Sequence, residues 1–413
     1  MVSFTNVAGI DCSPLFKNEK NDAGEEIANK LNLFVKEQNY NSHKYKIIKY
    51  DKLCFHDKNP TSSIDKIKSS GLFRSLIIYE GNIVACAPEK SLRCEDFHWK
   101  EKDFDSCYIE EFIDGTMINL FYAPWQNNED FGEWEIATRS SVGGKAAYFL
   151  ENNKRKSFRE MFLEALNLQK INLVELPKEY CYSFVLQHPD NRIVTPILEP
   201  CVYLIATYSI NENNISKINI DDIDNMALKE YINNKKINRP DKYSNLTYDK
   251  CLEIWGGEKT DYKCMGLVIT SPDKESRMKI RNPNYEKVKL IRGNQPKVQY
   301  TYLDMRNNKD SIKEYLKYYP EMEDKFKTFS DGLQNFTKEL YHYYKKCRIE
   351  KKIAIKEVPG KFKQHVYDLH GIFQRSFNDG NTRPQYITHT YIKSYLSKLP
   401  TQRLMYSLNH DHH

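Results

Sequence analysis

The sequence of 413 residues contains no run of eighteen apolar residues, and its ten cysteines include no Cys-x-x-Cys pair. The first absence argues against a membrane-spanning helix, which needs about twenty predominantly apolar residues. The start, Met-Val-Ser-Phe-Thr-Asn, also lacks the basic and apolar regions of a signal peptide. Cysteines that occur singly favour reduced structural thiols over disulfides or a zinc site. We therefore expect a soluble, intracellular protein with no membrane partner and no metal site.

Charge of neither sign dominates, because 62 basic residues face 56 acidic ones and leave a net charge of +6. This mild excess favours a polyanionic partner such as RNA without requiring one. The length predicts two domains. Frequent Asn, Lys, Ile and Tyr suggest an AT-rich genome, as in many protists and large DNA viruses. We expect a cytoplasmic location, or the virion or viral factory if the source is a virus.

The most informative part of the chain runs from residue 107 to residue 144. Its pattern predicts, in order, a strand over 108–112, the turn Asp114-Gly115, a strand over 116–122, and a strand over 134–138 that leads into Arg139. A hairpin is predicted shortly before it, because two apolar runs between residues 73 and 92 flank a Glu-Gly-Asn turn. Arg74 lies at the start of that hairpin. These strands predict an antiparallel sheet.

Two later stretches have the same extended character. Residues 182–194 read Tyr-Ser-Phe-Val-Leu-Gln-His-Pro-Asp-Asn-Arg-Ile-Val, and residues 265–269 read Met-Gly-Leu-Val-Ile. A basic strand follows, in which Lys279 and Arg281 alternate with apolar residues. Successive side chains of a strand point to opposite faces, so the two cations share one face.

Together these stretches resemble the phage-type RNA ligase 1 family of the covalent nucleotidyltransferase superfamily. The resemblance implies an α+β nucleotidyltransferase domain with antiparallel sheets around a cleft. Members of that family carry a Lys-x-Asp-Gly box whose lysine takes AMP from ATP. Here the box reads Phe-Ile-Asp-Gly, with Phe112 in the place of the nucleophile. The family's ribose-binding and metal-binding glutamates fall on Val185 and Met265, and Met is no ligand for magnesium.

The resemblance also implies which residues face the nucleotide. They are expected to bind phosphate or nucleotide and are Arg74, Asp114, Gly115, Arg139, Lys279 and Arg281. A plainer interpretation is that Asp114-Gly115 is a turn required by the hairpin, and that the cations are exposed ends of strands. Because Phe112, Val185 and Met265 stand where the family has its functional residues, no catalytic residue and no metal ligand is expected.

We therefore interpret the chain as a catalytically degenerate RNA ligase-like pseudoenzyme that binds phosphate or RNA or acts as a scaffold, with no cofactor. One alternative is an active, divergent ATP-dependent RNA ligase or nucleotidyltransferase that uses another lysine, ATP and magnesium. Lys90, which precedes the altered box, is a candidate for that lysine, although a phosphate contact or a solvated strand end is the simpler interpretation. A second alternative is a purely structural, possibly viral, component.

Beyond residue 297 apolar residues recur at intervals of three and four, which predicts helices. The expected domains are thus 1–297, the nucleotidyltransferase domain, and 298–413, an all-helical domain that offers a surface for a protein partner. The final His-Asp-His-His, residues 410–413, is expected to be a solvated end and not a metal site. Within the first domain, the spacing also predicts helices over 25–38 and 145–166, and a helical insertion in the polar stretch that ends at residue 250.

Overall fold

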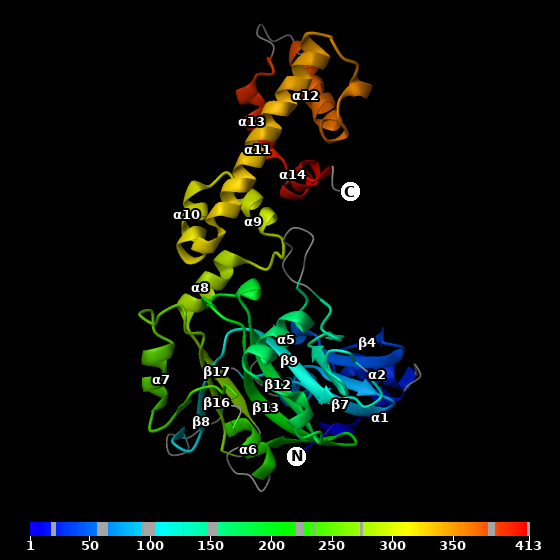
Figure 1. Cartoon of the computed structure of the whole chain (residues 1–413), viewed down its shortest axis with the longest axis vertical. Coiled ribbons are helices and arrows are strands. Elements are labelled where there is room, and N and C mark those ends of the chain that lie inside the picture. Colours follow the sequence, from blue (N-terminus) through cyan, green and yellow to red (C-terminus); the bar gives the residue numbers. More distant parts are fainter. Residues whose placement is uncertain are drawn as a thin grey trace. The chain divides into compact units, whose positions relative to one another are not determined.

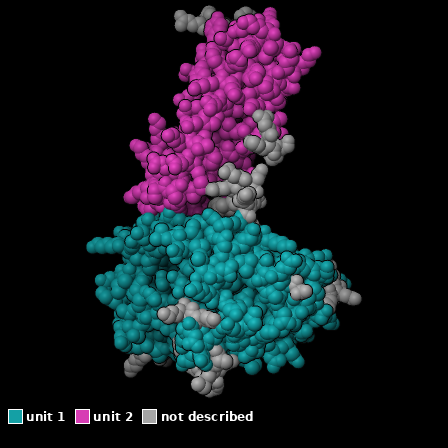
Figure 2. All heavy atoms as spheres, viewed as in Figure 1, with its two compact units in different colours: residues 1–289 teal, residues 290–413 magenta. Residues whose placement is uncertain are grey.

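The computed structural model describes residues 1–17, 22–55, 65–92, 94, 97, 104–126, 128–146, 156–219, 226–234, 237–272, 276–378 and 385–410. The chain divides into two compact units, Met1–Lys289 and Leu290–His413 (Figure 2). The first is α+β and the second is helical (Figure 1). The expected fold class, α+β with antiparallel sheets and a helical C-terminal part, is therefore confirmed. The sequence pattern had placed the division between residues 297 and 298.

Antiparallel sheets form the framework of the first unit. The largest sheet contains, in spatial order, β1 (Val2–Ser3), β14 (Asn214–Ile218), β13 (Cys201–Asn211), β12 (Tyr180–Gln187), β9 (Thr116–Tyr122), β10 (Trp134–Thr138) and β11 (Ser141–Val142). A second sheet contains β15 (Lys242–Tyr243), β8 (Tyr108–Glu111), β16 (Gly266–Thr270) and β17 (Arg277–Arg281). A third contains β4 (Leu33–Tyr40), β5 (His43–Tyr50), β6 (Leu76–Tyr79) and β7 (Asn82–Cys86). The short strands β2 (Asn6–Val7) and β3 (Ile10–Asp11) pair separately.

Alternation along the strands gives the large sheet two apolar faces. In β9, Ile118 and Leu120 pack with helix α5 (Phe158–Leu168), whereas Phe121 packs toward the β4–β7 sheet. Helix α6 (Met226–Asn234) adds to the first of these cores. The β15–β8–β16–β17 sheet has its own core, to which α7 (Tyr248–Trp255) contributes Cys251.

The remaining helices of the first unit are short or lie near its end. They are α1 (Ser13–Phe16), α2 (Asp22–Lys30) and α8 (Pro283–Arg292), which extends past the division. The helix expected over 25–38 is wrong in its second half, because β4 begins at Leu33 and pairs with β5 along its whole length. Tertiary pairing overrides the local helical spacing there. The polar stretch before residue 250 contains strand β14 as well as the expected helical segments.

Ser157 marks the beginning of helix α5. The helix expected over 145–166 starts at Phe158, after Ser157 caps it and Glu160 completes a capping box. Part of that expected range, residues 147–155, lies outside the described residues.

The second unit is a set of helices around α11 (Glu323–Tyr344). The others are α9 (Val298–Met305), α10 (Lys309–Tyr318), α12 (Gly360–Asn378), α13 (His389–Lys398) and α14 (Thr401–Leu408). Aromatic residues of the predicted stripes form the core; for example, the rings of Phe336 and Phe362 pack at a tilt of 47° with their centroids 4.8 Å apart. Residues 411–413 of the histidine-rich end lie outside the described residues.

Candidate functional site

A cavity of about 210 Å³ lies in the first unit, where the large sheet faces the β15–β8–β16–β17 sheet. We call it the central cavity. Strands β8, β16 and β17 line one side and β9, β12, β13 and β14 the other. The residues that matter below are Arg74, Glu110, Glu111, Phe112, Gly115, Val185, Lys217, Met265, Arg277 and Lys279.

Phe112, Val185 and Met265 all line the central cavity, although they are far apart in the sequence. Phe112 follows β8 and is held by a hydrogen bond from its backbone N–H to the carbonyl of Gly266 (2.9 Å). Val185 lies in the middle of β12, and Met265 directly precedes β16. None of these three side chains has a nucleophilic nitrogen or an oxygen ligand for a hard cation.

Lys279 projects into the same cavity from β17. Its Nζ lies 3.8 Å from the centroid of the Phe112 ring, within the range of a cation–π contact. In the described part of the chain, no carboxylate lies within ion-pair distance of this Nζ. Burial, together with the charges of Arg277 and Arg74, holds the pKa of Lys279 well below its usual range. The amine is therefore easier to deprotonate than an ordinary lysine.

Two arginines stand near this amine. Arg74 is half-buried, and burial with the charge of Arg277 lowers its pKa to about 10. Arg277 is buried, and its Nε lies 3.0 Å from Oε1 of Glu89, so part of its charge is compensated. Arg277 was not among the residues predicted from the sequence. The signal was present, because Arg277 shares the period-two face of β17 with Lys279.

Arg139 and Arg281, also expected to bind phosphate, do not line the central cavity. The Arg139 guanidinium stacks 4.7 Å from the centroid of the Tyr50 ring, and its Nε donates to the carbonyl of Arg74 (3.3 Å). Arg281 is half-exposed and pairs with Glu286 at 2.8 Å. Its guanidinium carbon is 5.8 Å from the centroid of the Phe112 ring, which places it beside the cavity.

Hydrogen bonds within the first unit hold the carboxylate of Asp114 in place. Its Oδ2 accepts from the backbone N–H groups of Val194 (3.1 Å) and Thr195 (2.9 Å), and its Oδ1 accepts from the hydroxyl of Tyr285 (2.7 Å). The residue is buried and does not line the cavity. Both carboxylate oxygens thus join distant parts of the first unit.

Gly115 does line the cavity, with φ of +152°. A Cβ at this position would lie 2.5 Å from the carbonyl oxygen of Leu186, so a side chain here would displace β12. Lys90, the other candidate nucleophile, does not line the cavity. Its Nζ lies 4.7 Å from the centroid of the Phe55 ring.

Acidic groups in the central cavity are limited to Glu110 and Glu111 among the described residues. Burial and the charge of Asp241 raise the pKa of Glu111. The described residues contain no group of three His, Cys, Asp or Glu side chains arranged to hold a metal ion. Met265, in the place where the sequence resemblance implies a metal-binding glutamate, offers magnesium no oxygen ligand.

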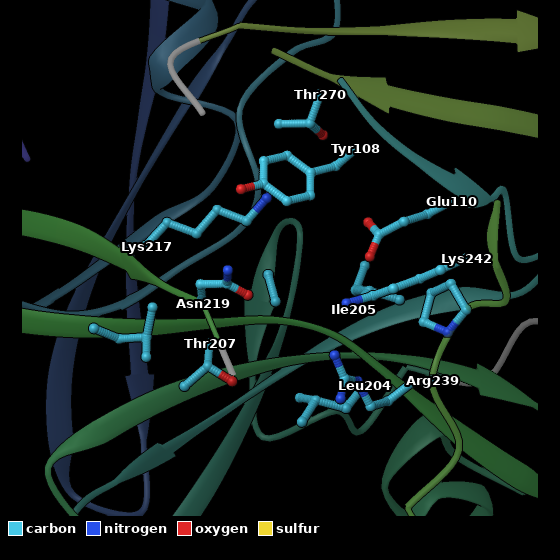
Figure 3. Close-up of a pocket in the computed structure, with 13 residues that line it drawn as sticks. Tyr108, Glu110, Leu204, Ile205, Thr207, Lys217, Asn219, Arg239, Lys242 and Thr270 are labelled. Atoms are coloured by element: carbon cyan, nitrogen blue, oxygen red, sulfur yellow. The ribbon is translucent and has the colours of Figure 1, made fainter. Parts of the chain in front are cut away.

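A smaller cavity adjoins the central one and shares Glu110 and Lys217 with it. Figure 3 shows Lys217 extending toward the ring of Tyr108, with Glu110 and Lys242 on the opposite side. Arg239 completes the charged part of its lining. The two cavities thus form one region with mixed but mainly basic walls.

Comparison with known proteins gives distant similarity to RNA ligases as a class. A stretch of 109 residues, 25% of this chain, is 32% identical to an RNA ligase of Rhodothermus phage RM378. A stretch of 283 residues, 64% of this chain, is 26% identical to an immediate-early protein ICP-46 homolog of Invertebrate iridescent virus 6. These alignments cover 23% of the phage protein and 58% of the viral protein, less than two thirds of either. No protein-family model matches the chain.

Among solved structures, a mutant Naegleria gruberi RNA ligase with ATP and Mn matches 49% of this chain and 58% of its own, with 12% identity and a TM-score of 0.34. The same ligase with PPi matches 45% of this chain and 52% of its own, with 12% identity and a TM-score of 0.31. None of the described helices is both long and apolar enough to span a membrane.

Proposed function

We propose that this chain is a catalytically degenerate RNA ligase-like nucleotidyltransferase that binds the phosphate groups of a nucleotide or RNA in the central cavity. One observation carries the proposal: Phe112, Val185 and Met265 lie together in that cavity, where the resemblance requires a lysine and two glutamates. Three apolar replacements remove the nucleophile, the ribose acceptor and the metal ligand. The cations that would contact phosphate, Lys279 and Arg74, are still there.

The charges favour an anion in this cavity. Lys279 has the Phe112 ring as its neighbour instead of a carboxylate, and Arg74 adds a second cation. A bound phosphate would supply the missing counter-charge and would favour the protonated amine. Glu110 and Glu111 oppose this, although burial and the charge of Asp241 raise the pKa of Glu111, so this carboxyl is protonated more readily than an exposed one.

A binding experiment tests the proposal. Pyrophosphate, ATP and a short single-stranded RNA are titrated into the full chain at low salt, and the affinities are compared with those of Lys279→Met. We expect the substitution to weaken binding by about tenfold or more, since a charge-assisted hydrogen bond contributes about 1.5–3 kcal/mol. The exposed Lys30 in α2 provides the matched control, Lys30→Met. Absence of binding by the parent protein, or equal binding by both variants, contradicts the proposal.

A second candidate function is favoured by the chemistry of Lys279. Its lowered pKa and its place in the cavity suit a nucleophilic amine. In this active, divergent nucleotidyltransferase, Nζ would attack the α-phosphorus of ATP with a divalent cation supplied from solution. A P–N bond would form, the bond to pyrophosphate would break, and the amine proton would pass to solvent.

Intact-mass measurement distinguishes the two functions. The chain is incubated with ATP or GTP and magnesium or manganese, and its mass is recorded. The degenerate function predicts an unchanged mass. A gain of one nucleoside monophosphate, mapped to Lys279 or to another lysine, favours the active ligase. If the chain forms no adduct and also binds no phosphate, the third function is favoured, which is a structural protein whose helical unit binds a protein partner.

A further inference from the structure

One segment of the helical unit carries a marked excess of positive charge. Residues 345–363 read Lys-Lys-Cys-Arg-Ile-Glu-Lys-Lys-Ile-Ala-Ile-Lys-Glu-Val-Pro-Gly-Lys-Phe-Lys. Eight basic and two acidic side chains give this segment a net charge of +6, the same as the whole chain. An excess of this size within nineteen residues attracts a polyanion.

The first eight of these residues, 345–352, form what we call the basic turn. It begins with a π-helical turn, Lys345–Ile349, directly after α11. π-Helical turns are rare and frequently occur at functional sites. Backbone N–H groups of Glu350 and Lys352 donate to the carbonyls of Lys345 and Lys346, both at 2.8 Å. The basic turn is thus a hydrogen-bonded, defined structure.

Lys351 adds a conformational feature to the basic turn. Its φ is +53°, in the left-handed region that residues other than glycine rarely adopt. Such a conformation costs about 1 kcal/mol, which the hydrogen bonds around it must offset. Lys351 is exposed at this position, so its ammonium is accessible from solvent.

The basic turn has more cations than its own carboxylate neutralises. Glu350 is shared by Lys345, at 3.4 Å, and Lys352, at 2.9 Å. Lys346 and Lys351 form no ion pair with any described residue. Phosphates of a polynucleotide would therefore meet at least three uncompensated charges within eight residues, counting Arg348.

An aromatic ring lies beside these cations. The guanidinium carbon of Arg348 is 5.4 Å from the centroid of the Tyr367 ring, which belongs to α12. Tyr367 is 51% exposed, so its ring is accessible from solvent. Proteins that bind single-stranded nucleic acid combine a basic surface with aromatic rings on which bases stack. The combination at this turn has both parts.

We propose that the basic turn and Tyr367 form a binding surface for single-stranded RNA, separate from the central cavity. The surface fits RNA better than an anionic membrane, because membrane-bound basic segments carry a broad apolar face of Trp, Phe and Leu. At the basic turn the large exposed apolar side chain is Ile349, and the neighbouring ring is a tyrosine with a polar tip. The surface does not depend on the function proposed for the cavity.

The test measures binding of a fluorescent thirty-nucleotide single-stranded RNA to the full chain at several salt concentrations. The basic-turn variant combines Lys346→Ala, Lys351→Asn and Lys352→Ala, with Asn chosen because it tolerates positive φ. Removal of three phosphate contacts should reduce the slope of log affinity against log salt by about 2, at roughly 0.7 per contact. Tyr367→Leu, which keeps the charges, should weaken binding at least about fivefold through lost stacking.

The matched control removes three exposed lysines from other helices of the same unit, as Lys309→Ala, Lys313→Ala and Lys327→Ala. It changes the net charge equally and should leave most of the affinity and the salt slope intact. Equal losses in the control and in the basic-turn variant would overturn the proposal, since only overall charge would then matter. Binding to phosphatidylserine vesicles with no RNA binding would also overturn it and would indicate a membrane surface.

The binding experiments distinguish failure of the proposal for the central cavity from failure of the proposal for the basic turn. Pyrophosphate binding is expected to be lost in Lys279→Met and kept in the basic-turn variant. The slope of log RNA affinity against log salt is expected to fall by about 2 in the basic-turn variant, which removes three contacts, and by only about 0.7 in Lys279→Met, which removes one. If RNA affinity follows Lys279 alone, the inference about the basic turn is wrong while the proposed function of the cavity stands.

Discussion

The ammonium of Lys279 lies 3.8 Å from the centroid of the Phe112 ring. The ring stands where the sequence resemblance places a catalytic lysine, so the substitution also gives the remaining lysine a new neighbour. An aromatic face attracts a cation more weakly than a carboxylate does and cannot accept its proton. Lys279 is half-buried, and desolvation with the charges of Arg277 and Arg74 lowers its pKa, in a cavity suited to an anion.

The pH dependence of stability should reveal this amine. Because the pKa of Lys279 is lower in the folded chain than the ordinary 10.5, the unfolded chain binds more protons between the two values. Lys279 therefore destabilises the fold below its folded pKa, and this penalty fades as pH rises toward 10.5, by at most about 1.4 kcal/mol per pH unit. Lys279→Met should be more stable than the parent at neutral pH, and the difference should shrink at alkaline pH.

Tryptophan fluorescence during urea unfolding provides the measurement, because all four tryptophans belong to the first unit. Lys30→Met, in an exposed position of α2, is the control and should show no such convergence. A stability difference between parent and Lys279→Met that stays constant from neutral to alkaline pH would contradict the shifted pKa.

Local patterns were sufficient to predict much of the fold. Period-two alternation predicted the strands that became β8, β9 and β10, and period-three-and-four stripes predicted α11 and α12. The helix expected through Phe34 failed, because β5 pairs with that segment and pairing depends on distant residues. The sequence is sufficient to predict an element whose pattern is local. It is not sufficient where pairing with a distant strand decides between helix and strand.

In the candidate site, too, the features set by local alternation could be predicted and those set by distant contacts could not. The sequence pattern put Lys279 on the right face of its strand, and it missed Arg277 on the same face. Asp114 was expected from the sequence to bind phosphate or nucleotide, and its contacts with Tyr285 and Thr195 could not be predicted because these partners are far away in the chain. Contacts of this kind are visible only once the chain has folded.

Gly115 offers a test of the turn beside the cavity. Gly115→Ala should destabilise the first unit by about 2 kcal/mol or more, because the new Cβ would lie 2.5 Å from the Leu186 carbonyl oxygen. Gly9→Ala is the matched control: its φ is +78°, and no atom lies within 4 Å of the added Cβ. It should cost only about 1 kcal/mol of backbone strain. Equal costs in urea unfolding would show that the close approach of β12 is absent.

His365 should make the helical unit sensitive to acid. Its Nδ1 lies 3.0 Å from the Tyr395 hydroxyl and its Nε2 2.8 Å from the Ser407 hydroxyl, and burial lowers its pKa to about 4. Below an ordinary pKa of 6.5 the unfolded chain binds a proton that the folded chain does not. The stability contributed is complete above pH 6.5 and is lost as pH falls toward 4, by up to about 3 kcal/mol.

Hydrogen exchange in peptides from α12 and α14 measures that loss within the full chain. His365→Gln, which cannot take up a proton, should lower stability at neutral pH but flatten the dependence between pH 6.5 and 4. The exposed His389 supplies the control, His389→Gln, with a profile like that of the parent. Protection of α12 that is independent of pH in the parent would show that His365 is not held neutral.

The last prediction concerns the return of chemistry to the central cavity. Phe112→Lys restores an amine, but Val185 and Met265 still offer no acceptor for a ribose and no oxygen ligand for a cation. The amine would also stand beside Lys279 without the ring that separates them, and like charges raise the cost of burial. We expect no nucleotide adduct on Phe112→Lys with ATP and magnesium by intact-mass measurement. The triple variant Phe112→Lys, Val185→Glu and Met265→Glu is the one expected to form an adduct, provided that circular dichroism shows it folded. An adduct on the single variant would mean that Val185 and Met265 occupy positions the reaction does not need.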